Sequence, residues 1–188
     1  MSARELGWYR LLLGWLEANL RQTTSERLGL RSTPLKLVRF PDSPGPGMCT
    51  WTTFEHSDLR WPGPGVEVGY ELVFSSRAEV DGLTVLRRAV ESLGAMQRPA
   101  QPGLVLLDLL VAVDGLSPLL RHAVLLPPWI WDHWEPLVEG ERRVEAVQVV
   151  PATEAEVDLA RREGVAALAE HWERALAQLL EPGRPSTL

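Results

Sequence analysis

The chain has 188 residues, a formal net charge of −6 and a pI near 5.3, and 45% of its residues are hydrophobic. This size and composition predict one soluble globular domain spanning residues 1–188, and the acidic balance argues against a nucleic-acid-binding protein. No stretch of about 18 residues is uniformly apolar and Cys49 is the only cysteine, so we expect no membrane span, no internal disulfide and a cytoplasmic location.

The first half of the chain predicts one helix and three strands. Leucine and tryptophan recur at three- and four-residue steps through residues 4–21, which predicts a helix with a wide apolar stripe. β-Branched and aromatic residues predict strands at 35–40 and 49–54, separated by Pro/Gly turn chemistry. Residues 66–75 (VEVGYELVFS) alternate without interruption, which predicts a half-buried strand with one apolar face. The three strands are expected to form an antiparallel meander.

The middle of the chain predicts a second helix and further strands. Amphipathic spacing predicts a helix over residues 79–97. Residues 104–113 (LVLLDLLVAV) are apolar in both registers; a buried helix is the alternative, but the β-branched end and the Gly/Pro flanks favour a strand. Shorter strands are expected at 122–126 and 144–150.

A capping box marks the start of the last helix. Thr153 and Glu156 have the spacing in which each side chain bonds the backbone N–H of the other residue. We therefore expect a helix over residues 154–180, followed by a frayed tail at 182–188. The whole pattern predicts an α+β fold, with a mostly antiparallel sheet packed by the three helices.

Residues capable of catalysis or metal binding are scattered. His56, Ser57 and Asp58 are adjacent in a predicted loop, whereas a catalytic triad must converge in space; a loop whose polar residues cap or bridge turns is the favoured interpretation. Glu67 and Glu71 could serve as paired carboxylates, although a solvated strand face is favoured. The histidines occur singly, which argues against a zinc site. We therefore expect no catalytic residues, no cofactor and no metal.

Three tryptophans fall within residues 127–136 (PPWIWDHWEP). They fill the core over a proline-stiffened loop, or one or two of them are exposed as anchors for a protein partner, because tryptophan is enriched at interface hot spots. Asp132 and Glu135 would then supply a polar rim around the contact. Trp61, in an earlier Pro/Gly loop, can be interpreted either as a core residue or as a partner anchor. The candidate partner-binding residues are Trp129, Trp131, Asp132, Trp134, Glu135 and Trp61.

The order of several short motifs is more specific than any one of them. TWTTFEHSDL (50–59) precedes GYELVF (69–74), an LL-PP-W stretch (125–129) follows, and the end is VVPATEAEVDLARREGVAAL (149–168). This order resembles the Suppressor of fused domain family, especially its bacterial members, over roughly residues 34–180. In that family a T-x-G-x-S strand leads to a G-x-E-L strand, and P-x-T/S-x-x-E opens the last long helix.

The resemblance implies an α+β domain without a known catalytic centre. Animal members bind and sequester a transcription factor, and many bacterial members look like immunity proteins that neutralise a toxin from the same locus. One departure is that Phe54-Glu55-His56 stands where glycine is expected before the Ser-Asp pair. The residues that carry over are structural: Ser57, Asp58, Gly69, Glu71, Leu72, Thr153 and Glu156.

The resulting hypothesis is a non-enzymatic immunity protein that binds and neutralises a cognate toxin. Its negative charge would speed the capture of a basic toxin. One alternative is a regulatory adaptor that sequesters an endogenous protein. Another is an enzyme with an unrecognised cleft near His56, Glu67 and Glu71.

Overall fold

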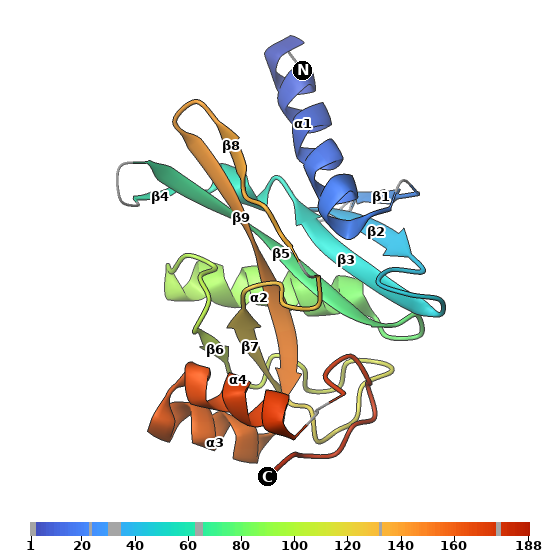
Figure 1. The fold of residues 1–188 in the computed structure, drawn as a ribbon, viewed down its shortest axis with the longest axis vertical. Helices are drawn as coiled ribbons and strands as arrows, with labels where there is room; N and C mark the ends of the chain where they lie inside the picture. The colour runs from blue at the N-terminus through green and yellow to red at the C-terminus, as the bar shows by residue number, and fades with distance from the viewer. Residues whose placement is uncertain (1–2, 23, 30–34, 63–65, 132, 176–177) are drawn as a thin grey trace.

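The computed structural model describes residues 3–22, 24–29, 35–62, 66–131, 133–175 and 178–188 (Figure 1). Its helices are α1 (Ala3–Leu20), α2 (Gly82–Met96), α3 (Glu154–Glu163) and α4 (Val165–Arg174), with a 3-10 turn η1 (His56–Asp58). Its strands are β1 (Glu26–Gly29), β2 (Lys36–Pro41), β3 (Met48–Phe54), β4 (Trp61–Pro62), β5 (Glu67–Arg77), β6 (Val105–Leu106), β7 (His122–Leu126), β8 (Leu137–Glu139) and β9 (Arg142–Ala152). Within these ranges, no helix is both long and apolar enough to cross a membrane.

The strands described form one nine-stranded sheet in the order β1-β2-β3-β5-β9-β7-β6, with β4 added beside β5 and β8 beside β9. The predicted antiparallel meander is confirmed as β2-β3-β5. The central pair, β5 and β9, is parallel, because the connection through α2, β6 and β7 carries the chain back to the end of the sheet where β5 began. All other pairs are antiparallel, so the predicted α+β class with a mostly antiparallel sheet is confirmed.

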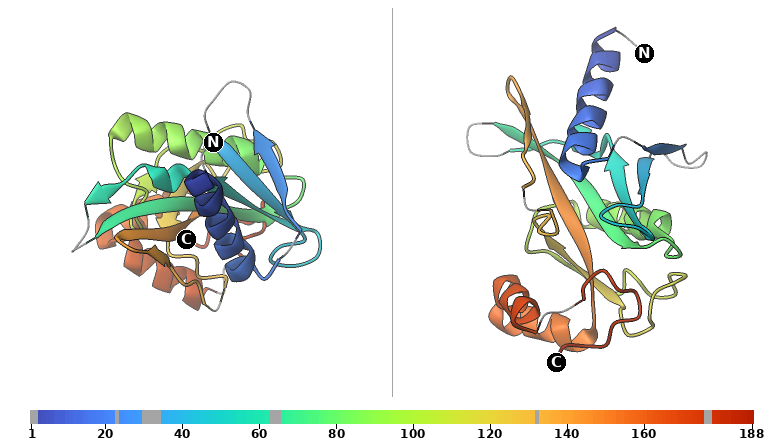
Figure 2. Two further views of the ribbon diagram at one scale, coloured as in Figure 1. Left: turned by 90° about the horizontal axis from the view of Figure 1, so that it is seen from above. Right: turned by 45° about the vertical axis from the view of Figure 1, so that its right-hand side comes forward.

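Helices cover both faces of the sheet (Figure 2). On β9, Val144 and Ala146 contact the α1 cluster, whereas Val147 and Val149 point to the opposite face and contact the α2 cluster. Farther along β9, α3 and α4 cover the same face as α1. Because both faces are covered, β5 is buried on both sides, and the prediction of a half-buried strand at 66–75 is wrong.

The apolar run at 104–113 does not form the predicted strand. Only β6 is extended, and the chain then turns through Asp108 (φ 51°) and Ala112 (φ 54°). The prediction is wrong because it considered only a strand or a helix. The segment instead forms successive turns, which bury some leucines of the run and leave others at the surface. The buried residues are Leu106, Leu109, Leu110 and Val113, and the exposed ones are Leu107 and Val111.

The predicted helix over 154–180 is two helices. Its start is confirmed, because Thr153 and Glu156 form both bonds of the capping box. It breaks at Gly164 (φ 93°), after which α4 begins and ends at Arg174. The break reverses the chain, so that α3 packs against α4 and both cover the end of the sheet.

The expectation of a frayed tail is also wrong. Arg184 is only 4% exposed and donates from Nη1 and Nη2 to the two carboxylate oxygens of Glu156, at 2.7 and 2.9 Å. Its Nη2 also donates to the carbonyl of Pro151, and the hydroxyl of Thr187 donates to Glu156. A buried, bidentate ion pair therefore fixes the tail against the start of α3.

Candidate partner-binding site

The tryptophan segment (residues 127–136) connects two strands that pair with the same edge of β9. β7 leaves this edge at the pair Leu126–Gln148, and β8 rejoins it at the pair Leu137–Val144. The segment therefore passes the stretch of β9 that lies between the two pairings. Two of its aromatic rings, Trp131 and Trp134, pack against the α1 cluster.

Helix α1 holds the tryptophan segment in place. The ring of Trp15 meets that of Trp134 edge-on at 5.8 Å, and Trp131 meets Trp134 in the same way at 4.9 Å. The indole N–H of Trp15 donates to the carbonyl of Glu135, and the backbone N–H of Glu135 donates to Asn19 Oδ1 at 2.8 Å. These contacts place the segment side by side with α1.

A cleft of about 260 Å³ lies between the end of α1, the tryptophan segment and the β2–β3 turn. The side-chain amide of Gln22, just beyond α1, donates to the carbonyl of Asp42 at 3.3 Å and so connects the helix end to the turn. We call this the tryptophan cleft. It is lined by Leu20, Arg21, Gln22, Pro44, Ile130, Trp131 and His133.

The tryptophan cleft is lined by both aliphatic and polar residues. Its aliphatic residues are Pro44, Ile130 and the nearly buried Leu20. In the described part of the chain, the side chains of Arg21 and His133 form no ion pair and no hydrogen bond, and the buried indole N–H of Trp131 has no acceptor. A buried donor without an acceptor is costly, but Arg21 and His133 are exposed and carry no such cost.

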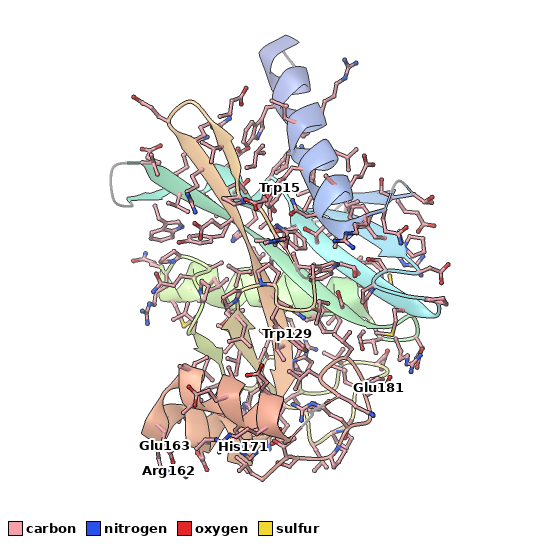
Figure 3. The ribbon with its side chains drawn as sticks, viewed as in Figure 1. Trp15, Trp129, Arg162, Glu163, His171 and Glu181 are labelled. Carbon is pink, nitrogen blue, oxygen red and sulfur yellow. The ribbon has the colours of Figure 1, made fainter. Side chains whose placement is uncertain are left out.

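The structure brings together most, but not all, of the candidate residues predicted from sequence. Trp131 lines the tryptophan cleft, and Trp129, one residue before the cleft-lining Ile130, is 49% exposed. Trp134 and the Glu135 backbone hold the segment to α1, and Asp132 lies outside the described residues. Figure 3 shows Trp15 on α1 and Trp129 nearer to the C-terminal helices. Trp131 and Trp134 therefore pack against the core, whereas Trp129 is exposed and its role as a partner anchor stays a prediction.

Trp61 lies apart from this group. It belongs to β4 and pairs with Val68 of β5, whose side chain shares the face of Leu72 and α2 rather than the face of α1. The cleft residues outside the tryptophan segment, from the end of α1 and the β2–β3 turn, had no signal in the sequence. Their proximity depends on contacts between segments far apart in the chain.

The family-like motifs meet at a buried carboxylate. Glu71 is fully buried, and its Oε1 accepts from Ser57 N at 3.1 Å, Ser57 Oγ at 2.7 Å and Glu55 N at 2.9 Å, while the Thr53 hydroxyl donates to Oε2. Burial raises the pKa of Glu71 to about 7, although the hydrogen bonds from Thr53 and Ser57 oppose the rise. The favoured interpretation of a solvated face is wrong for Glu71, but Glu67 is exposed and pairs with Arg60.

Two backbone features explain the spacing of these motifs. A Cβ atom on Gly69 would lie 2.1 Å from the carbonyl oxygen of Ser57, so only glycine allows the loop to approach β5 this closely. Glu55 has φ 78°, the left-handed conformation that glycine adopts readily. In the pattern T-x-G-x-S, read as Thr53 to Ser57, Glu55 occupies the glycine position. The turn is therefore kept without the glycine.

The three adjacent residues of η1 have separate partners. Ser57 Oγ donates to Glu71, and Asp58 accepts from Arg142 at 3.3 Å. Burial lowers the pKa of His56 to about 4, so its ring is neutral near pH 7. The interpretation of a loop whose polar residues bridge turns is confirmed for Ser57 and Asp58. Across the described ranges, no group of three or more His, Cys, Asp or Glu side chains is arranged to hold a metal ion.

Comparison with known proteins places the chain among related folds. The family model of Suppressor of fused protein (SUFU) matches residues 31–185. A Neisseria gonorrhoeae FA 1090 protein described as a SUFU homolog has a similar crystal structure, with a TM-score of 0.67 and 14% identity over 97% of this chain and 98% of that one. A chain of the Sufu–Fu complex crystal structure matches with a TM-score of 0.67 and 13% identity over 97% of this chain and 91% of that one. A search of curated proteins gave no match.

Proposed function

Because this chain belongs to the Suppressor of fused family, we propose that it is a protein-binding module that holds its partner at the tryptophan cleft. The observation that carries the proposal is the family match over residues 31–185. The structurally similar Sufu chain was crystallised in a complex with Fu, which supports a protein as the ligand.

The tryptophan cleft has the features of an interface hot spot. Trp129 is 49% exposed, and the residue after it, Ile130, lines the cleft of about 260 Å³. Interface energy concentrates in large aromatic side chains beside pockets. Trp15 and Asn19 fix the backbone of Glu135 to α1, and a preorganised contact loses less entropy on binding.

The partner we propose is a toxin, and the chain is then its cytoplasmic immunity protein. The formal net charge of −6 supports this role, because an acidic protein captures a basic toxin faster. A non-enzymatic role is supported by the use of Ser57 and Glu71 in structural hydrogen bonds. The second candidate is an adaptor that sequesters an endogenous regulator, which the Sufu–Fu complex favours by analogy.

The test is co-expression of the chain with the product of the adjacent gene. An immunity protein should co-purify with a neighbouring toxin and restore growth of cells that produce it. Trp129→Ala should weaken the complex by at least about tenfold. The matched control is Leu119→Ala, which truncates a residue with 57% exposure outside the cleft and should leave affinity unchanged.

Other outcomes discriminate between the proposals. Co-purification with an endogenous regulator, without protection from a toxin, would assign the adaptor role and exclude the immunity role. A complex that is indifferent to both Trp129→Ala and Ile130→Asp would remove the tryptophan cleft as the binding site. Growth inhibition that persists in the presence of a bound toxin would contradict neutralisation.

A further inference from the structure

We propose that the end of the sheet formed by β4, β8 and the adjoining parts of β5 and β9 is a second protein-binding surface, which takes a basic segment of the partner. We call it the sheet end. The inference rests on the proposed function, because it assumes a protein partner, but it concerns the opposite face of the sheet from the tryptophan cleft. Its centre is Trp61, the candidate residue that the cleft does not include.

Strand register places a row of side chains across the sheet end. Trp61 of β4 pairs with Val68 of β5. Arg143 of β9 pairs with Val68 on one side and with Val138 of β8 on the other. Residues directly opposite each other point to the same face, and Tyr70, two residues after Val68, points the same way. Because Tyr70 packs against the α2 cluster, the row lies on the α2 face of the sheet.

This part of the α2 face is open to solvent. Val138 is 59% exposed, and Trp61 and Tyr70 are half-buried. Figure 1 and Figure 2 show β4 and the β8–β9 hairpin extending beyond α2, so the helix that covers this face elsewhere leaves the sheet end uncovered. Neighbouring strands lie about 4.8 Å apart, so the row across four strands measures about 14 Å, which about four extended residues span.

The charges of the sheet end indicate which partner fits. Its glutamates Glu139 and Glu141 lie beside the turn of the β8–β9 hairpin, are exposed, and form no ion pair within the described part of the chain. They are not compensated by neighbouring arginines, because each of these already faces another carboxylate, at 2.7 to 3.6 Å. The pairs are Arg143 with Glu145, Arg142 with Asp58 and Arg60 with Glu67. A cationic side chain is therefore the complement of this surface.

The hairpin that carries the two glutamates is attached to its neighbours. The guanidinium of Arg142 lies over the ring of Trp8 in α1, 4.2 Å from its centroid, and donates to Asp58 of η1 at 3.3 Å. These contacts connect the base of the hairpin to two other elements. A surface presented in a fixed position loses less entropy when a partner binds.

The charge of the whole protein acts in the same direction. The net charge of −6 attracts a basic partner over long range. Exposed charges are largely screened beyond about 8 Å at physiological salt, so Glu139 and Glu141 act on cations placed next to them. Since the apolar row lies close by, the best occupant is a short segment in which a lysine or arginine flanks an apolar side chain.

The experiment is an NMR titration of the full chain with two short peptides. The probes are acetyl-Gly-Lys-Leu-Lys-Gly-amide and acetyl-Gly-Gln-Leu-Gln-Gly-amide, which share the leucine and differ in the two flanking cations. The indole N–H signal of Trp61, identified by its loss in Trp61→Phe, reports binding. The Lys peptide should bind at least about threefold more tightly than the Gln peptide, and the difference should shrink at high salt.

Paired variants assign the preference to the hairpin. The double variant Glu139→Gln, Glu141→Gln should abolish the difference between the two peptides. The matched control is Glu163→Gln, Glu170→Gln, which removes the same charge from exposed positions of α3 and α4 and should preserve the difference. Val138→Ser should weaken the binding of both peptides, because it removes apolar surface and no charge.

The inference fails if the two peptides bind equally, or if their difference survives in Glu139→Gln, Glu141→Gln. A shift of the Trp61 signal with rising protein concentration and no peptide would instead assign the sheet end to a second copy of this chain. Failure of the proposed function is a separate result. Partner capture that depends on Trp129, with no shift of the Trp61 signal by either peptide, would leave the tryptophan cleft standing and remove only this second surface.

Discussion

The backbone N–H and the hydroxyl of Ser57 both donate to one carboxylate oxygen of Glu71, at 3.1 and 2.7 Å. This pair joins the β3–β4 connection to the middle of β5. It connects the motif at residues 50–59 to the motif at residues 69–74. The buried carboxylate also makes the stability of the fold depend on pH.

Glu71 should destabilise the folded protein as the pH rises. Its pKa is raised from 4.5 to about 7 by burial, so the folded state binds the proton more tightly than the unfolded state. The stability that the proton provides is present near the ordinary pKa and is lost as the pH rises to about 7. Between about pH 5 and pH 8, the stability of wild type relative to Glu71→Gln should fall by about 2 kcal/mol, measured by urea unfolding.

The comparison with Glu71→Gln is necessary because His56 titrates with the opposite sign. Its pKa is lowered from 6.5 to about 4 by burial, so the unfolded state takes up a proton first as the pH falls, and stability is lost between these two values. His56→Gln should remove that loss and keep the effect of Glu71. If the difference in unfolding free energy between wild type and Glu71→Gln does not change with pH, the raised pKa of Glu71 is contradicted.

The left-handed turn at Glu55 should favour glycine. Glu55 has φ 78°, a conformation that costs a residue with a Cβ atom roughly 1–2 kcal/mol. Both Glu55→Gly and Glu55→Ala remove the ion pair with Lys36, but only the first relieves the backbone. Glu55→Gly should therefore be more stable than Glu55→Ala by about 1 kcal/mol in thermal unfolding; equal stabilities would show that the turn relaxes at no cost.

Gly69 should not tolerate alanine. The added methyl group would lie 2.1 Å from the carbonyl oxygen of Ser57, so the loop would have to move away from β5 and loosen its bonds to Glu71. Gly69→Ala should lose about 3 kcal/mol or more of unfolding free energy. Gly14→Ala is the control, because Gly14 lies within α1 with nothing within 4 Å of an added Cβ, and it should gain about 0.5 kcal/mol. A mild effect at Gly69 would contradict the close packing.

The tail should contribute to stability through Arg184. Arg184→Met leaves the buried carboxylate of Glu156 without its cation, and should cost about 3 kcal/mol near neutral pH. Burial alone would raise the pKa of Glu156, but the hydrogen bonds from Arg184 and Thr153 outweigh it and lower the pKa to about 2. The stabilisation is therefore present above pH 4.5 and is lost as the pH falls toward about 2.

Acid unfolding measures this contribution. The difference in unfolding free energy between wild type and Arg184→Met should become smaller as Glu156 becomes protonated. Arg162→Met, an exposed change near the end of α3, should have little effect at any pH. A full-length Arg184→Met protein as stable as wild type at neutral pH would show that the tail is not fixed by this pair.

The sequence by itself determined the elements whose signals are local. Alternation along 66–75 identified β5, and the spacing of Thr153 and Glu156 identified the start of α3, because the groups that form these features lie within a few residues of each other. The order of the short motifs indicated the family for the same reason, since each motif is a local turn or strand requirement.

Only the tertiary structure decided which groups are buried and which segments meet. Glu71 looked solvated because a strand pattern records one apolar face and cannot show that η1 seals the other. Arg184 looked like part of a loose tail because its partner, Glu156, lies 28 residues earlier. The tryptophan cleft joins the end of α1, the β2–β3 turn and the segment around Trp131. Contacts between distant segments leave no periodic trace in the sequence, and they are the contacts that form this candidate site.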